Sequence, residues 1–355
     1  MLAALAGWPL FVALVLVLGG VAARLFILRR LAALGHDLGD RGPGAADRAA
    51  EGTDPAAEGT VAPAFDVMAE AAVRLALAGA LLMPLALGLL FLRQLLEFRD
   101  PFVPWSEDAR LLLLGTAWGE TWSWAMAASA ACAGGFALAA RARGVGTGSH
   151  VGWWVGAAAA LALGFFPALT GHASGTGGIR WLTVTADGLH VYAAGAWLGG
   201  LTFVLYADRR VRRSVSGPRH ALAAAPVAPE VTRAGRGATG APRGSDAGAL
   251  PMLVPLFSPL AVGCVATLVL TGVLAAWIHM PSPGAFVSAP YGRILGVKLL
   301  LAMLAFALGA ANWRMLTPRL TRADGPAALR RIATLELWLG QAVLLATAAL
   351  VRTAP

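Results

Sequence analysis

The chain has 355 residues, of which 58% are hydrophobic and only 13% are charged, and its mean hydropathy is +0.68. An ordinary soluble domain carries about 25% charged residues, so the composition excludes that class and indicates a polytopic membrane protein. A net charge of +9 favours nucleic-acid binding in a soluble chain. Here the basic residues lie between apolar segments, where they determine topology, and we expect no nucleic-acid partner.

Eight apolar segments follow in chain order, each near the roughly 20 residues that a helix needs to cross a bilayer. The first lacks the basic start of a signal peptide and has its arginines behind its apolar run, which predicts a retained span. Long apolar runs without strand alternation predict helices, not barrel strands. We therefore predict an all-α bundle in the lipid bilayer, with spans at 8–28, 68–92, 111–140, 151–170, 184–207, 258–280, 292–316 and 332–351.

Arginine bias predicts the orientation of this bundle. The loops after the odd-numbered spans are rich in arginine, and those after the even-numbered spans are poorer in it. Because cytoplasmic loops carry the excess of basic residues, the odd-numbered loops are expected in the cytoplasm and both termini on the periplasmic or extracellular side. Two cytoplasmic loops, 35–65 and 215–252, are rich in Ala, Gly and Pro, which predicts flexible segments.

Three polar or thiol side chains inside spans are candidates for a transport path. Glu120 is expected near the middle of the span 111–140, where an unpaired carboxylate is costly, so it is a transport or proton-relay candidate. Cys132 and Cys264 lie in apolar runs, where a disulfide framework has nothing to cross-link. They are expected to be small buried hydrophobes, with a soft inner relay as the alternative.

Histidines gather at the predicted outer surface. His172 follows the fourth span, His190 lies about two turns into the fifth, and His279 closes the sixth. Asp187 shares a helix face with His190 and could orient the imidazole or act as a ligand itself. Met280 adds a thioether, which selects Cu(I), whereas imidazole accepts copper in either oxidation state and also zinc. The pattern favours a copper site.

Each of these residues has a structural alternative. His172 and His279 could be interfacial histidines bonded to water or a carbonyl group, and Met280 could serve packing alone. His190 and Asp187 could serve only to form structural hydrogen bonds between their helix and a neighbouring one. Two histidines on neighbouring transmembrane helices could also provide the axial ligands of a b-type haem.

Two further polar groups, Lys298 and Glu336, are expected to form structural pairs. Lys298 could pair with an acid or extend outward to the membrane surface, and Glu336 could pair with Arg314 or Asn312. The glycine-rich stretch at 175–178 lacks the strand and βαβ context of a nucleotide loop, and no serine-histidine-acid arrangement is found. We expect no enzyme.

Several short motifs, taken in order, resemble the copper resistance protein D family. The resemblance covers roughly 151–355, and the last four spans are the most similar. The motifs are Gly171-His172-Ala173, Asp187-x-x-His190, Trp197-Leu198-Gly199-Gly200, Phe257-Ser258-Pro259-Leu260-Ala261, Thr271-Gly272-Val273, Tyr291-Gly292-Arg293 with Lys298, Asn312-Trp313-Arg314 and Leu335-Glu336.

The resemblance implies an eight-helix protein of the bacterial inner membrane that moves copper from the periplasm to the cytoplasm, often beside a periplasmic copper-binding partner of the CopC type. It implies that His172 and His190 contact the metal, with Asp187 beside them. No CopC-like domain is fused to the chain, which leaves open a non-transporting assembly or scaffold protein on the same framework. The oligomeric state is not predicted.

Overall fold

The computed structural model describes residues 2–39, 58–142, 147–171, 177–215, 248–279, 284, 289–316 and 325–353. These residues are almost entirely helical, and none of them forms a strand. The helices are α1 (Leu2–Ala22), the π-helical η1 (Ala23–Leu28), α2 (Arg29–Gly39), α4 (Glu58–Phe98), α5 (Trp105–Leu114), α6 (Ala117–Arg141), α7 (Thr147–Gly164), α8 (Phe166–Thr170), the short 3₁₀ turn η3 (Gly177–Ile179), α9 (Arg180–Val215), α11 (Leu250–His279), α13 (Pro290–Ala311), the π-helical η4 (Asn312–Leu316) and α14 (Gly325–Leu350).

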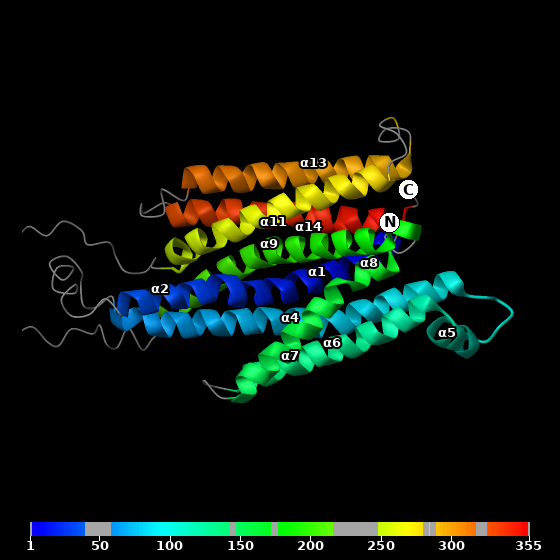
Figure 1. The fold of residues 1–355 in the computed structure, drawn as a ribbon, viewed down its shortest axis with the longest axis horizontal. Helices are drawn as coiled ribbons and strands as arrows, with labels where there is room; N and C mark the ends of the chain where they lie inside the picture. The colour runs from blue at the N-terminus through cyan, green and yellow to red at the C-terminus, as the bar shows by residue number, and fades with distance from the viewer. Residues whose placement is uncertain are drawn as a thin grey trace, which may run out of the picture.

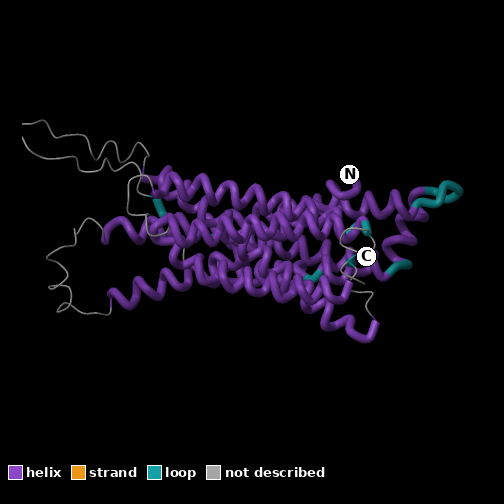
Figure 2. The backbone as a smooth tube through the Cα atoms, turned by 90° about the horizontal axis from the view of Figure 1, so that it is seen from above, coloured by secondary structure: helices purple, strands orange, loops and turns teal. Residues whose placement is uncertain are grey.

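Among the described residues, eight helical segments are long and apolar enough to cross a membrane, which confirms the predicted all-α bundle of eight spans. The long helices run along one common direction, with the connections at the two ends (Figure 2). Both chain termini lie at the same end, as an even number of spans requires (Figure 1). We call this the terminal end, and the opposite one, which holds Arg29, Arg30 and the arginines of 209–213, the basic end.

The two loops predicted to be flexible fall largely outside the described residues. Of 35–65 and 215–252, residues 40–57 and 216–247 are not described. The ends of these segments continue the neighbouring helices, because α4 already begins at Glu58 and α11 at Leu250. The second and sixth helices are therefore longer than the apolar runs that predicted them.

A helix break corrects the predicted position of Glu120. The apolar run 111–140 is two helices: α5 ends at Leu114, and α6 begins at Ala117. Thr116 caps α6, because its side-chain oxygen accepts a hydrogen bond from the Gly119 N–H at 2.9 Å. Glu120 thus lies in the first turn of α6 and is exposed, not near the middle of a span as the sequence predicted. Hydropathy alone cannot detect this break, since Gly115 interrupts the helix without adding charge.

The first span, α1, is the centre of the bundle and packs against α4, α9 and α14. In the most apolar stretch of this span 67% is buried, and in that of α9 56% is buried. The two helices cross at Gly19 and Gly199, where a methyl group on either glycine would collide with the backbone of the other. The small residues of α9 thus let the backbone of a neighbouring helix approach closely.

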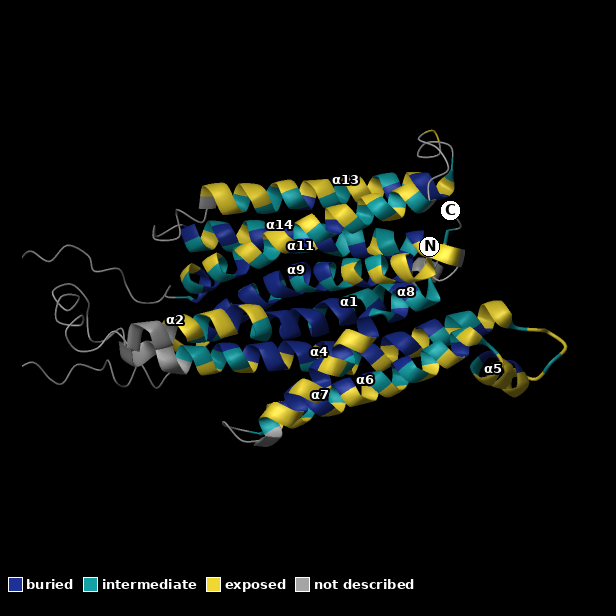
Figure 3. Cartoon of the chain, in the orientation of Figure 1, coloured by how far each residue is buried: buried dark blue, intermediate teal, exposed yellow. Residues whose placement is uncertain are grey.

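Two groups of helices flank this central pair. On one side α6 and α7 pack against each other, and α6 also packs on α4. On the other side α11 packs on α9, and α13 packs mainly on α14 (Figure 1). In α11, α13 and α14, only 22%, 11% and 28% of the most apolar stretch is buried. Figure 3 shows the contrast, with α1 mostly buried and α13 mainly exposed or intermediate.

Candidate functional site

The predicted residue pair on α9 has a polar partner on α11. The Nδ1 atom of His190 lies 2.9 Å from the Oγ1 atom of Thr271. The Thr271 hydroxyl donates its own hydrogen to the carbonyl oxygen of Thr267, at 2.7 Å. A hydroxyl has one hydrogen to donate, so Thr271 must accept from His190, which places the imidazole proton on Nδ1. The lone pair of the neutral ring is then on Nε2, the arrangement that a metal-binding histidine needs.

A third helix adds charge to this pair. Lys298, in the third turn of α13, lies within electrostatic range of both His190 and Asp187. Tyr291, in the first turn of α13, lies within range of Asp187. We call these residues, with Thr271, the polar cluster. It joins α9, α11 and α13 in the half of the bundle nearer the terminal end, and it supplies one carboxylate, one imidazole nitrogen, hydroxyl groups and one ammonium.

The sequence motifs contained all five residues of the polar cluster, but periodicity assigned a chemical role only to Asp187 and His190. Thr271 and Tyr291 carry no charge, so a search for ionisable residues in spans passes over them. Lys298 was expected to pair with an acid, and Asp187 is an acid within its electrostatic range. Lys298 is the only lysine in the sequence, and this rarity was the signal that could have marked it as a candidate site residue.

The other predicted ligands are not part of the described geometry. His172 and Met280 lie outside the described residues, and His279 is described only as the last residue of α11, without its side chain. Within the described parts of the chain, no group of three or more His, Cys, Asp or Glu side chains could hold a metal ion. The convergence of His172, His190 and His279 therefore stays a prediction.

Helix geometry separates His190 from His279 in depth. His279 follows Thr271 by eight residues in the same helix, a rise of about 12 Å. Since Thr271 contacts His190, the backbone of His279 lies roughly two turns nearer the terminal end than the polar cluster. The two histidines occupy successive depths of the bundle.

The three candidates for a transport path do not lie together. Glu120 is exposed near the start of α6, at the terminal end. Cys132 is buried in the hydrophobic cluster of α1, α4, α6 and α7. Cys264 is buried in a different cluster, which α9 and α11 share with α1 and α4. A path through all three residues would have to cross the packed centre of the bundle.

A buried acid, Glu336, lies nearer the basic end than the polar cluster does. Glu336 of α14 is 3% exposed, and the Trp197 side chain donates a hydrogen bond to its carboxylate. Gly309 of α13 leaves room for this carboxylate, because a methyl group there would lie 3.1 Å from the Glu336 Oε1 atom. The sequence predicted Arg314 or Asn312 as the partner of Glu336, whereas the observed partner is Trp197 from α9. Trp197 belongs to a motif that the sequence analysis quoted without assigning a role.

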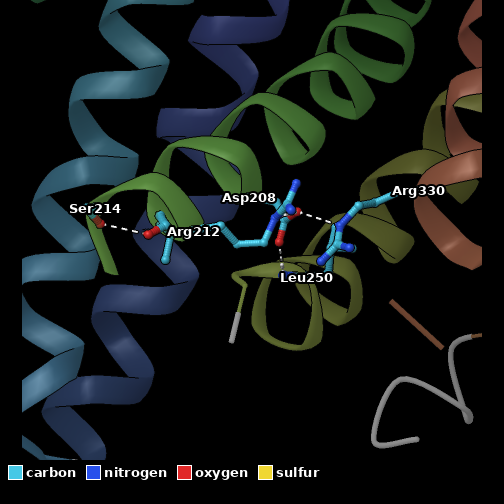
Figure 4. Close-up of polar contacts among 6 residues, drawn as sticks. Asp208, Arg212, Ser214, Leu250 and Arg330 are labelled. Atoms are coloured by element: carbon cyan, nitrogen blue, oxygen red, sulfur yellow. Dashed lines mark hydrogen bonds and ion pairs between the residues drawn. The ribbon is translucent and has the colours of Figure 1, made fainter. Parts of the chain in front are cut away.

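An ion-pair cluster at the basic end ties three helices together (Figure 4). Asp208 of α9 is 1% exposed and accepts hydrogen bonds from Arg330 Nε at 2.9 Å and Arg212 Nε at 3.1 Å. It also accepts a hydrogen bond from the backbone N–H of Leu250, the first residue of α11, at 3.4 Å. A buried carboxylate with two arginines is a structural clamp between α9, α11 and α14. The sequence analysis missed it because Asp208 stands inside an arginine-rich stretch that was interpreted as a topology signal.

Comparison with known proteins agrees with the resemblance noted in the sequence. Residues 251–350 match the family model described as copper resistance protein D. No curated protein and no solved structure matches the chain. The matched range contains α11, α13 and α14 with Thr271, Tyr291, Lys298 and Glu336, whereas Asp187 and His190 lie before it.

Proposed function

We propose that this chain, which carries a copper resistance protein D domain in residues 251–350, binds copper at His190 and moves it across the bacterial inner membrane. The family match over residues 251–350 supports membrane-associated copper resistance as the general function. The copper ion, the histidine site and transport into the cytoplasm are the specific proposal. A periplasmic copper-binding protein of the CopC type is the proposed donor of the ion.

The observation that carries the proposal is the hydrogen bond between His190 and Thr271. It holds the imidazole in the tautomer whose Nε2 can bind a metal, and it fixes the ring on a helix that is among the best packed in the bundle. Imidazole nitrogen is a ligand for copper in both oxidation states. Asp187, one turn before His190, is the second proposed ligand.

Lys298 can balance the negative charge of the Asp187 carboxylate when no metal is bound. Its ammonium lies within electrostatic range of Asp187, so the carboxylate has a positive partner when no metal is bound. A copper ion beside Asp187 and His190 takes over that role, and repulsion moves the flexible lysine side chain aside. In this proposal the ion is bound for only part of the time, because Lys298 competes for the same carboxylate. A site in a transport path must release its ion as well as bind it.

The order of the ligands follows from their depths. His172, His279 and Met280 are proposed to collect copper at the terminal end, which arginine bias predicts to be periplasmic. His190 and Asp187 then receive the ion about two helical turns deeper. Copper is the transported ion in this scheme, so it binds each group of ligands only transiently.

Equilibrium copper binding to the purified protein tests the proposal. His190→Ala is expected to weaken binding at least tenfold, because it removes the proposed nitrogen ligand. His150→Ala is the matched control: His150 is exposed on α7, away from the polar cluster, and its loss is expected to leave binding unchanged. Equal binding by both variants would sink the proposal. A Soret band in the absorption spectrum would indicate haem, whose iron such histidines could bind as axial ligands.

A further inference from the structure

A cavity lies between the last four spans, separate from the polar cluster. It has a volume of about 260 Å³ and is bounded by α9, α11, α13 with η4, and α14. Trp197 stands on its wall, seven residues beyond His190 in α9, which places the cavity about 10 Å nearer the basic end. The walls are mainly apolar and aromatic, with Phe257, Phe306 and Trp313 among them.

Besides the Ser258 hydroxyl, which donates a hydrogen bond to the carbonyl oxygen of Val254 at 2.8 Å, two oxygen-bearing side chains line this cavity. One is the buried carboxylate of Glu336, whose described partner is the Trp197 N–H. The other is Asn312, whose Oδ1 atom is buried and accepts no hydrogen bond from the described residues. An unsatisfied buried oxygen such as Asn312 Oδ1 is costly, so it calls for a donor that a ligand could supply. Asn312 also begins the π-helical turn η4, a distortion that is frequent at functional sites.

The cavity faces the lipid between α11 and α13. These two helices make almost no contact with each other, since α11 packs on α9 and α13 on α14. Val262 and Trp313, which both line the cavity, are 59% and 53% exposed, so they form its rim. At membrane depth, an exposed apolar rim meets acyl chains. A ligand can therefore enter from the bilayer without passing through either aqueous face.

We propose that this cavity binds a lipid-soluble ring compound with a hydroxyl group, of the phenol or hydroquinone class. An apolar cavity of about 150 Å³ accepts a benzene ring, so 260 Å³ accommodates one substituted ring. The hydroxyl donates to Glu336 or Asn312, the ring packs against Trp197 and Phe306, whose ring centroids are 5.0 Å apart, and an alkyl tail leaves between α11 and α13. A copper ion is a poorer fit, because the lining offers no sulfur or imidazole ligand.

This binding site is independent of copper binding at His190, and its test needs no metal. The probe is a phenol with an alkyl tail that carries a diazirine, added to the protein in nanodiscs. After illumination, mass spectrometry of peptides is expected to find label on 254–265 and 309–313. Binding of the same probe is expected to exceed that of its methyl ether about tenfold, the effect of one hydrogen bond to a charged group. Label confined to other helices would overturn the proposal, as would equal binding of phenol and ether.

Two variants locate the site. Ala261→Phe fills the cavity and is expected to abolish labelling of 254–265, whereas Ala127→Phe, on an exposed position of α6, is the matched control that keeps it. Glu336→Gln retains the shape and is expected to reduce the preference for the phenol over its ether. Labelling that survives Ala261→Phe would contradict the assignment. If Glu336→Gln fails to fold, the comparison of phenol and ether on the unaltered protein still decides the role of the hydroxyl.

Discussion

The centre of the bundle and its last three spans are built in opposite ways. α1 and α9 are well buried and touch backbone to backbone at Gly19 and Gly199. In the most apolar stretches of α11, α13 and α14 only 22%, 11% and 28% is buried, and α13 packs mainly on one neighbour. Yet these loosely packed helices carry Thr271, Lys298 and Glu336 into the membrane. The family match falls on them as well, over residues 251–350.

The difference bears on which polar residues serve the fold and which serve the proposed binding. A polar or ionisable side chain inside the membrane is expensive, and a helix with few packing contacts gains little to offset it. The polar residues of the last spans are therefore not explained by stability, which agrees with a role in binding. α9 belongs to both regions, because one face packs on α1 through Gly195 and Gly199 while Asp187 and His190 join the polar cluster.

The largest effect is expected from breaking the central contact. Gly199→Leu places a side chain against the α1 backbone at Val15 and Gly19, and rigid helices cannot move apart without opening the core. We expect loss of folded protein, measured as the yield of a monodisperse peak on size-exclusion chromatography. Gly263→Leu on α11 is the control, because a methyl group at Gly263 would meet no atom within 4 Å. A normal yield of Gly199→Leu would refute the packing account.

The clamp at the basic end should matter next. Asp208→Ala leaves Arg212 and Arg330 without their shared carboxylate, and removal of one member of a buried ion pair costs about 3–5 kcal/mol. A lower thermal unfolding temperature is the expected measurement. Glu70→Ala removes an exposed acid that pairs with Arg74 and Arg210, and such pairs contribute about 0–1 kcal/mol. Equal destabilisation by the two variants would contradict the clamp.

A smaller effect is expected in the polar cluster. Thr271→Val keeps the shape of the side chain but removes the oxygen that accepts from His190 Nδ1. Loss of such a supporting hydrogen bond typically weakens metal binding about 10- to 100-fold, and we expect the lower end because water can replace it partly. Thr267→Val, on the same helix, removes a hydroxyl that donates to the carbonyl oxygen of Gly263 and is the control in the copper titration. Unchanged copper affinity of Thr271→Val would mean that the bond does not orient a ligand.

The smallest effect is expected at Glu120. The side chain is exposed in the first turn of α6, so Glu120→Gln removes only a favourable charge at a helix N-terminus, about 0.3–1 kcal/mol. Copper uptake by cells that express the variant should match the unaltered protein. Loss of uptake at normal expression would restore Glu120 to a transport path.

Most of the fold could be predicted from the sequence because membrane helices obey a simple length rule. The eight apolar runs are eight helical spans. Hydropathy failed to detect the helix break at Gly115 and Thr116, because neither residue adds charge. The break places Glu120 in the first turn of α6 and not near the middle of a span. Helix ends outside the apolar runs, such as the start of α4 at Glu58, also lie beyond what hydropathy can detect.

The candidate site was predictable only in part. Spacing placed Asp187 and His190 on one face, and the lysine stood out by its rarity. The contact of His190 with Thr271 joins residues 81 positions apart, and which helix packs beside α9 is not encoded in periodicity. For the same reason, periodicity could not predict the hydrogen bond from Trp197 to Glu336 or the ion pairs of Asp208 with two arginines. Partners on different helices require the three-dimensional arrangement.

Copper-edge X-ray absorption of the copper-loaded protein tests the central claim most directly. The account predicts an imidazole contribution to the copper environment that is lost in His190→Ala and retained in His150→Ala. An unchanged spectrum in His190→Ala would contradict the assignment of His190 as a copper ligand.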